Sequence, residues 1–132
     1  MRFYAVGNQY LSSIQQGIQA FHCLGEMILD YGAVDLTLND WLANHKTLIC
    51  LNGGNNERLQ SFYHFLVDEN NPYLFTKFHE DEQSLGSIIT CVGLIVPESI
   101  YNFKEDDPTT WDELTPWEIE LATKLKKMPT AR

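Results

Sequence analysis

The feature that most constrains the fold of this chain is a helical pattern placed between two β-rich apolar runs. The runs occupy residues 2–6 and 46–51. Between them, apolar side chains recur at the three-and-four spacing of one helix face, at Ile14, Ile18, Phe21 and Ile28. This spacing predicts a long helix whose apolar face packs on a core. Helices that alternate with strands are typical of α/β folds.

Local signals set the ends of this helix. Ser12 or Ser13 is a suitable N-cap, because a hydroxyl oxygen accepts a hydrogen bond from a free backbone amide of the first turn. Tyr31-Gly32 supplies a stop signal. The helix is therefore expected to run to about Asp30.

Two glycines, Gly17 and Gly25, lie inside the predicted helix. Each costs about 1 kcal/mol in a helix interior. Close packing of the helix against the sheet is one explanation for them, and plain tolerance is the other.

A second helix and two further strands follow. Asn52-Gly-Gly-Asn-Asn56 breaks the chain, and either Asn55 or Asn56 can cap the helix that follows. An apolar stripe at helical spacing begins at Leu59. Residues 73–78 and 87–96 are predicted to be strands, the second of them near the centre of the sheet. The continuous run 46–51 predicts a strand buried on both faces. The order β-α-β-α-β-β predicts an α/β sandwich with a four-stranded sheet.

The end of the chain differs in character from the rest. Residues 104–108 form a polar, mostly acidic linker, so we divide the chain into an α/β domain, 1–103, and a tail, 104–132. Thr115-Pro-Trp-Glu118 combines a threonine cap, a proline at the first helical position and a glutamate at the third. This motif predicts a C-terminal amphipathic helix, which docks on its own domain or on a partner chain.

Composition limits the class of protein. The 132 residues, 44% of them hydrophobic, suffice for one folded domain with a substantial core. No apolar run approaches the ~20 residues needed to span a bilayer, so no membrane association is expected. Three cysteines in apolar surroundings are typical of small buried side chains in a reducing compartment. We therefore expect a cytoplasmic protein.

The net charge of −9 bears on binding partners. An acidic surface repels phosphate backbones, so binding to long nucleic acid by electrostatics alone is not expected. Positive charge gathers only in the last turn, at Lys124, Lys126, Lys127 and Arg132. The histidines show no metal-ligand spacing and there is no Cys-x-x-Cys pair, so neither a metal nor a cofactor is expected.

A line of polar side chains runs beside the apolar stripe, formed by Gln15, Gln19, His22 and Glu26. It begins just past the end of a strand, where open α/β sheets bind ligands. His22 is a candidate general acid or base, because histidine exchanges protons near neutral pH. The alternative is a histidine that completes a polar network between helix and sheet. Gln15 and Gln19 are candidates for hydrogen bonds to a ribose or a base edge, or are ordinary exposed glutamines.

Two loops also carry groups that can bind ligands. Glu80, Asp81 and Glu82 are consecutive acids between the last two strands. Such carboxylates perform acid–base chemistry or bind a divalent cation, and a solvated loop is the alternative. Asn52-Gly-Gly-Asn-Asn56 precedes a helix, where backbone amides can hold an anion. It lacks the lysine of a P-loop, so a plain turn is the better interpretation.

Several motifs occur in an order that points to a known family. They are Leu11-Ser-Ser-x-Gln-Gln-x-Ile-Gln-x-x-His22, Trp41, the strand around 48–51, Phe78-His-Glu80 and Thr90-Cys-Val. Over residues 1–100 the chain resembles the type 2 peptidyl-tRNA hydrolase superfamily. The likeness is greatest to the short aminoacyl-tRNA hydrolase-like proteins of bacteriophages. The family fold is a three-layer sandwich of a four-stranded mixed sheet with helices on both faces.

The resemblance implies hydrolysis of the ester of a peptidyl- or aminoacyl-tRNA. On that basis His22 and either Asp81 or Glu82 would assist the attacking water. Gln15, Gln19 and Thr90 would bind the 3′ end of the tRNA.

The chain departs from the family pattern within the implied site. Gln15 stands where full-length family enzymes carry a lysine, Ser13-Ile14 where they carry Pro-Gly, and Asp81-Glu82 where they carry Pro-Asp. Glutamine has no charge with which to hold a phosphate.

These departures leave alternatives open. One is a non-catalytic relative that binds a protein partner or a small nucleotide, for example an acidic phage protein that engages a basic host factor. Another is a homodimer in which the C-terminal helix packs across the interface.

Overall fold

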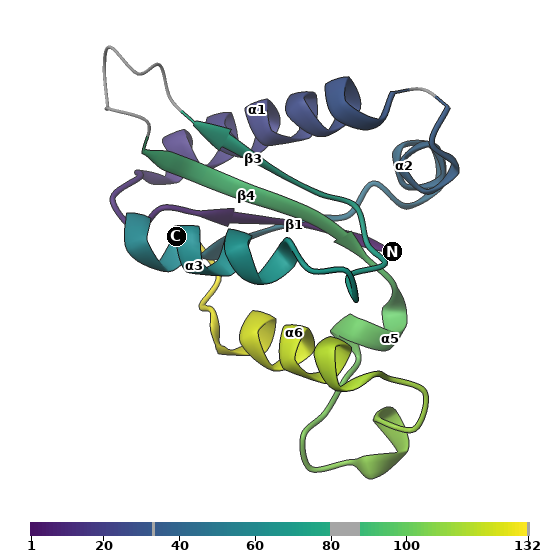
Figure 1. Cartoon of the computed structure of the whole chain (residues 1–132). Helices are drawn as coiled ribbons and strands as arrows, with labels where there is room; N and C mark the ends of the chain where they lie inside the picture. Colours follow the sequence, from purple (N-terminus) through teal and green to yellow (C-terminus); the bar gives the residue numbers. More distant parts are fainter. Residues whose placement is uncertain (33, 80–87, 132) are drawn as a thin grey trace.

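The computed structural model places a four-stranded sheet between two layers of helices (Figure 1). The structure describes residues 1–32, 34–79 and 88–131. The strands are β1 (Arg2–Gly7), β2 (Leu48–Asn52), β3 (Phe75–His79) and β4 (Ile89–Val96). Their order is β2-β1-β4-β3, with β1 parallel to β2 and β4 antiparallel to both of its neighbours. The predicted α/β sandwich with a four-stranded mixed sheet is confirmed.

Helices cover both faces of the sheet. The helical segments are α1 (Ser13–Tyr31), α2 (Leu36–Asp40), η1 (Trp41–His45), α3 (Asn56–Leu66), α5 (Glu98–Tyr101), η2 (Pro108–Thr110) and α6 (Pro116–Lys127). In Figure 1, α1 and α2 lie above the sheet, and α3 and α6 lie below it. In the part of the chain that the structure describes, no helix is long and apolar enough to cross a membrane.

The ends of the main helices follow the predicted caps. The Ser12 hydroxyl accepts the amide of Gln15, and the Gln15 side chain accepts the amide of Ser12. Thr115 and Glu118 form the same reciprocal pair at the start of α6. Asn55, one of two expected caps, opens α3. Local side-chain chemistry therefore fixes where these helices begin.

The face of α1 that meets the sheet is not the predicted one. The side chains buried against the sheet are Gln16, Gln19, Ala20, Cys23 and Met27. The predicted core face is exposed instead, with Ile14 77% and Phe21 72% accessible. The physical reason is that the polar members of the buried face have hydrogen-bond partners at the strand ends, which removes the cost of burying them.

A glycine in the sheet, Gly93, allows α1 to lie close. A Cβ added to Gly93 on β4 would come within 2.7 Å of Phe3 and 2.8 Å of the Cys23 sulfur. The two glycines of α1, Gly17 and Gly25, are not packed in this way, because nothing lies within 4 Å of a Cβ added at either position. Close packing of these two glycines on the sheet is therefore excluded.

The C-terminal helix packs on its own domain. Trp117, Leu121 and Leu125 of α6 belong to the same core cluster as Leu59 and the β4 residues below the sheet. The Trp117 ring also stacks on Phe65 at 4.9 Å between centroids. A second cluster, which includes Phe3 and Trp41, fills the space between the sheet and α1.

The β2 edge of the sheet is covered by the end of the chain. β2 is an edge strand with only Leu51 buried, so the prediction of a strand buried on both faces was wrong. Its outer edge pairs with the chain terminus, because Asn52 donates to the Pro129 carbonyl at 2.8 Å and Ala131 donates to the Cys50 carbonyl at 2.9 Å. Such pairing blocks the addition of foreign strands at an open edge.

Candidate functional site

Part of the sequence-predicted site assembles where α1 crosses the carboxyl end of the sheet. β1 and β3 run in the same direction, since both are antiparallel to β4, and both end here. This is the position at which open α/β sheets bind ligands. The side chains that meet here are Asn8, Gln16, Gln19, His22, Phe78 and Thr90.

Thr90 and Gln19 form a buried polar pair at the centre of the cluster. The Thr90 hydroxyl donates to Gln19 Oε1 at 2.8 Å and lies 3.3 Å from the Phe78 carbonyl. Thr90 is 2% and Gln19 6% exposed. A register shift between Phe78 and His79 leaves Thr90 as the extra residue of β4, which turns its side chain toward α1. The structure thus brings together two of the three residues expected to bind substrate.

Gln16 and Asn8 extend the network, and sequence reasoning missed both. The Gln16 amide donates to the Asn8 carbonyl at 3.1 Å, and the Asn8 amide donates to the Ile89 carbonyl at 3.4 Å. The Gln16 side chain occupies the space that a Cβ on Gly7 would fill. The signal for this contact in the sequence was Gly7 at the end of the first strand, because a glycine lets another group approach the backbone closely.

His22 lies at the surface of this cluster. Its ring is exposed and stacks on Phe78, with 4.8 Å between centroids and an interplanar angle of 11°. The Phe21 ring meets it edge-on at 6.1 Å. Stacking on Phe78 therefore holds the plane of the imidazole while the side chain stays exposed to solvent. An exposed histidine held in this way can exchange a proton with a bound molecule.

The remaining predicted site residues are placed differently. Gln15 is exposed, and its side-chain oxygen is engaged by the Ser12 amide in the helix cap at 2.9 Å. Its side-chain NH₂ group can therefore donate a hydrogen bond to a ligand at the N-terminus of α1. Asp81 and Glu82, together with Glu80, lie outside the described residues.

Cys50 and Cys91 are not suited to act as nucleophiles. Hydrogen bonding to Cys23 and burial together raise the pKa of the Cys91 thiol well above its ordinary value. Burial also raises the pKa of Cys50, which is half-buried rather than fully buried as expected. Because the thiolate is the reactive form, these shifts lower reactivity at neutral pH.

A second concave site lies on the other side of the same sheet end. It is a pocket of about 790 Å³ between the turn before α3 and the last turn of α6. Three cations line it, Arg58, Lys124 and Lys127, against one carboxylate, Glu57. The pocket is locally basic in a chain of net charge −9.

Residues 52–55 of the turn Asn52-Gly-Gly-Asn-Asn56 form one wall of this pocket. Gly54 has a φ of 89°, a conformation that favours glycine, and Asn55 caps α3. The sequence alone favoured a plain turn because the motif lacks the lysine of a P-loop. The two lysines of the pocket, Lys124 and Lys127, come from a distant part of the chain. The pocket connects to the first cluster through the backbone. Gln9 lines the pocket and donates its backbone amide to the Gly54 carbonyl at 2.8 Å, and the residue before it, Asn8, belongs to the first cluster.

Across the described ranges, no group of three histidine, cysteine or acidic side chains could hold a metal ion. No protein-family model matches the chain, and no curated protein matches it significantly. What this protein does must therefore be inferred from its own residues and their geometry.

Proposed function

We propose that this protein binds the 3′ end of an aminoacyl- or peptidyl-tRNA and hydrolyses the ester to the terminal ribose. One observation carries the proposal: the exposed His22 ring is held by Phe78 beside the buried Gln19–Thr90 pair, at the carboxyl ends of β1 and β3. The motif order of residues 1–100 supports the same reaction through its resemblance to type 2 peptidyl-tRNA hydrolases.

In the proposed reaction, water attacks the ester carbonyl carbon. His22 takes a proton from the water and returns it to the ribose oxygen as the ester bond breaks, so that a free carboxylic acid and an intact tRNA 3′ end are released. Gln19 and Thr90 act as positioning residues, because both are buried and keep α1 fixed over β4. Gln15 would donate its amide to the ribose, and Asp81 or Glu82 would orient the water.

The basic pocket offsets the unfavourable charge of the chain for a nucleic-acid ligand. Arg58, Lys124 and Lys127 provide positive charge next to the Gln9 turn that links the two sites. A phosphate of the tRNA end bound there would be attracted locally even though the net charge of the chain is −9. The presence of Gln15 where the related enzymes carry a lysine is compatible with this arrangement, because the cations of the basic pocket would provide the phosphate contacts.

The test is hydrolysis of an N-blocked aminoacyl-tRNA by wild type, His22→Ala and the matched control His64→Ala. His64 is exposed on α3, on the other face of the sheet. The proposal predicts that His22→Ala lowers kcat by about 10²- to 10⁴-fold, while His64→Ala leaves it unchanged. Equal turnover in all three chains would remove His22 from the mechanism.

A second candidate function is non-catalytic binding of a small nucleotide. It is favoured by the size of the basic pocket, about 790 Å³, which falls within the ~300–1,000 Å³ of ordinary small-molecule sites. Calorimetric titration with AMP and ATP would test it on wild type, Lys127→Ala and Lys126→Ala. Lys126 is an exposed neighbour outside the pocket, so the two variants have equal net charge.

This candidate predicts that only Lys127→Ala weakens nucleotide binding, by about 3- to 10-fold for one charge-assisted contact. Equal affinities in Lys127→Ala and Lys126→Ala would place any binding outside the pocket.

A further inference from the structure

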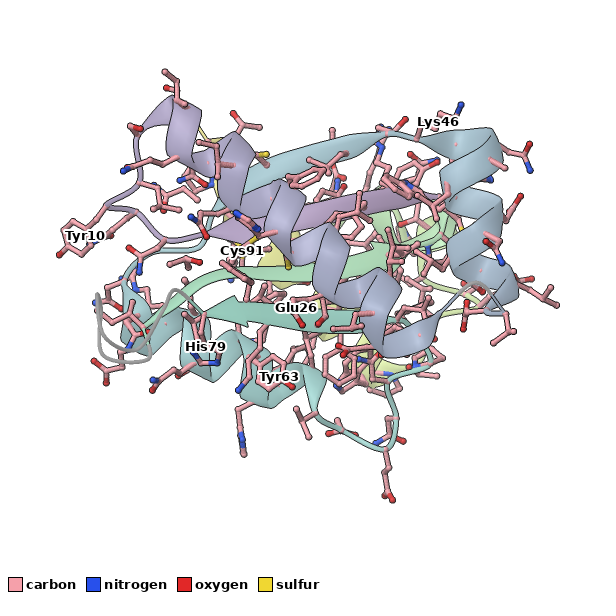
Figure 2. All side chains as sticks on the ribbon, turned by 90° about the horizontal axis from the view of Figure 1, so that it is seen from above. Tyr10, Glu26, Lys46, Tyr63, His79 and Cys91 are labelled. Atoms are coloured by element: carbon pink, nitrogen blue, oxygen red, sulfur yellow. The ribbon has the colours of Figure 1, made fainter. Side chains whose placement is uncertain are left out.

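The outer face of α1 carries an unusual amount of exposed apolar surface. In the parts of the chain that the structure describes, nine large hydrophobic side chains are exposed, and five of them lie on α1. These five are Ile14, Ile18, Phe21, Ile28 and Leu29. Figure 1 shows α1 as the outermost layer on its side of the sheet, and in Figure 2, seen from above, its ribbon lies in front of the sheet. Exposed apolar patches of this kind mark interaction surfaces.

Four of these side chains form a single stripe along the helix, and Leu29 lies at its margin, about 80° around the axis from Phe21. Ile14, Phe21 and Ile28 are seven residues apart, and Ile18 and Gly25 fall between them. At 3.6 residues per turn, all of these positions lie within about 60° of Phe21 around the helix axis. A seven-residue apolar repeat is the pattern by which one helix packs along another.

The stripe lies in a part of the chain that has no formal charge. Residues 3–25 contain no Asp, Glu, Lys or Arg. The two acids of α1 point elsewhere, since Asp30 accepts a hydrogen bond from Thr76 on β3 and Glu26 lines a groove along that strand. A second copy of this acidic chain can therefore approach α1 without direct charge repulsion.

The stripe is also self-complementary. If two α1 helices run antiparallel about a two-fold axis at Phe21, Ile14 of one copy faces Ile28 of the other, and Gly17 faces Gly25. Ile18 faces Leu24, which is half-buried at the margin of the stripe. Both glycines have open space where a side chain would be, so the two helices can come close. Reciprocal contacts of this kind define a two-fold dimer interface.

We propose that this protein forms a homodimer through the outer faces of α1, antiparallel about a two-fold axis at Phe21. The exposed fractions of the five apolar side chains amount to about three whole side chains, or roughly 500 Å² at about 150–200 Å² each. A standard interface buries about 800 Å² per partner, of which about 65% is apolar in homodimers. The stripe therefore supplies the apolar core that such a dimer needs.

A membrane surface fits this helix less well. Helices that lie on membranes carry Lys and Arg on their polar face. The only formal charges on α1 are the two acids, Glu26 and Asp30. The symmetry about Phe21 also has no function at a membrane, whereas it is required for pairing with an identical copy.

Sedimentation equilibrium on the full chain tests the dimer, with Phe21→Glu as the disruptive variant and Val67→Glu as the control. Phe21 is 72% and Val67 55% exposed, so each substitution adds the same charge at a surface position, and Val67 lies outside α1. The dimer predicts that wild type and Val67→Glu associate at micromolar concentration. Phe21→Glu places two carboxylates at the axis and raises the dimer dissociation constant at least 100-fold.

A charge-pair experiment tests the antiparallel arrangement. Ile14→Glu alone and Ile28→Lys alone should each weaken association, whereas an equimolar mixture should form a heterodimer in which the new charges face each other. Circular dichroism checks that each variant keeps its helix content. A wild-type chain that is monomeric at millimolar concentration would overturn the dimer, as would equal association of wild type and Phe21→Glu. A mixture no stronger than the separate variants would overturn the antiparallel pairing.

Discussion

At the scale of single residues, hydrogen-bonded glutamines decide which way α1 faces. Gln16 and Gln19 lie against the sheet because the Asn8 carbonyl and the Thr90 hydroxyl bond to them. Each such bond adds only about 0.5–1.5 kcal/mol net, but leaving a buried amide without its partner costs more. The glutamines therefore select one orientation of the helix, and the isoleucines face outward as a consequence.

Two glycines predict opposite effects for the same substitution. Gly93→Ala should lower the free energy of unfolding by about 1–3 kcal/mol, because the new methyl group meets the Phe3 ring and the Cys23 sulfur. Gly25→Ala should raise it by about 0.5–1 kcal/mol, because the position is open and helical. Urea unfolding at a chain concentration that keeps the protein monomeric measures both. Two changes of the same sign would contradict the packing described for α1.

The Tyr73–Glu118 contact predicts a pH-dependent contribution to stability. The Tyr73 hydroxyl donates to the Glu118 carboxylate, which also caps α6, and burial and this hydrogen bond raise the pKa of Tyr73 above its ordinary value of 10.0. The unfolded chain loses the phenol proton first as the pH rises. The contact therefore stabilises the fold fully below about pH 10, and this contribution declines above it.

Tyr73→Phe should consequently cost about 1–2 kcal/mol of unfolding free energy near pH 8, for the lost hydrogen bond to a charged group. The difference from wild type should shrink above pH 10, when measured by urea unfolding across that range. Tyr10→Phe serves as the control, since the Tyr10 side chain is 80% exposed. A difference that does not change with pH would refute the role given to Tyr73.

At the scale of elements, the chain terminus completes the sheet. The Asn52 and Ala131 amides form backbone bonds between β2 and residues 129–131. α6 positions this segment by packing Leu121 and Leu125 beneath the sheet. The C-terminal helix thus has two functions: it covers one face of the sheet, and it delivers an edge-covering segment to β2.

Ending the chain at Met128 should expose the β2 edge. We expect the Asn52 amide, which bonds to Pro129, to lose protection from hydrogen exchange, and the free energy of unfolding to fall by about 1–2 kcal/mol for two lost backbone bonds. The Gly53 amide is the internal control because it bonds to the Gly7 carbonyl at 2.8 Å. Unchanged exchange at Asn52 would show that the terminus does not cover this edge.

The elements were more predictable than their orientations. Ser12, Asn55 and Thr115 mark helix starts through local chemistry, so the sequence alone located them. The inward face of α1 depends on partners supplied by β1 and β4, and no pattern within α1 encodes them. The edge position of β2 likewise depends on the order of the strands, which a local apolar run does not contain.

At the scale of the whole molecule, two candidate sites share one end of the sheet. The His22 cluster lies on the α1 side and the basic pocket on the α3 and α6 side, with the Asn8–Gln9 turn between them. Gln19 and His22 were named from the helical spacing of a line of polar side chains, and Thr90 was named from the family resemblance. Sequence reasoning did not find the pocket, since the pocket's cations come from two helices far apart in the chain, α3 and α6.

The most direct test of this account is a single-turnover measurement with the unmodified protein in excess over an N-blocked aminoacyl-tRNA. The quantity measured is the rate at which the blocked amino acid is released. The account predicts a rate that rises and saturates with protein concentration, and that exceeds spontaneous hydrolysis at least 100-fold, the lower limit for one well-placed acid–base group. A release rate equal to the spontaneous rate at micromolar protein would contradict the proposed reaction.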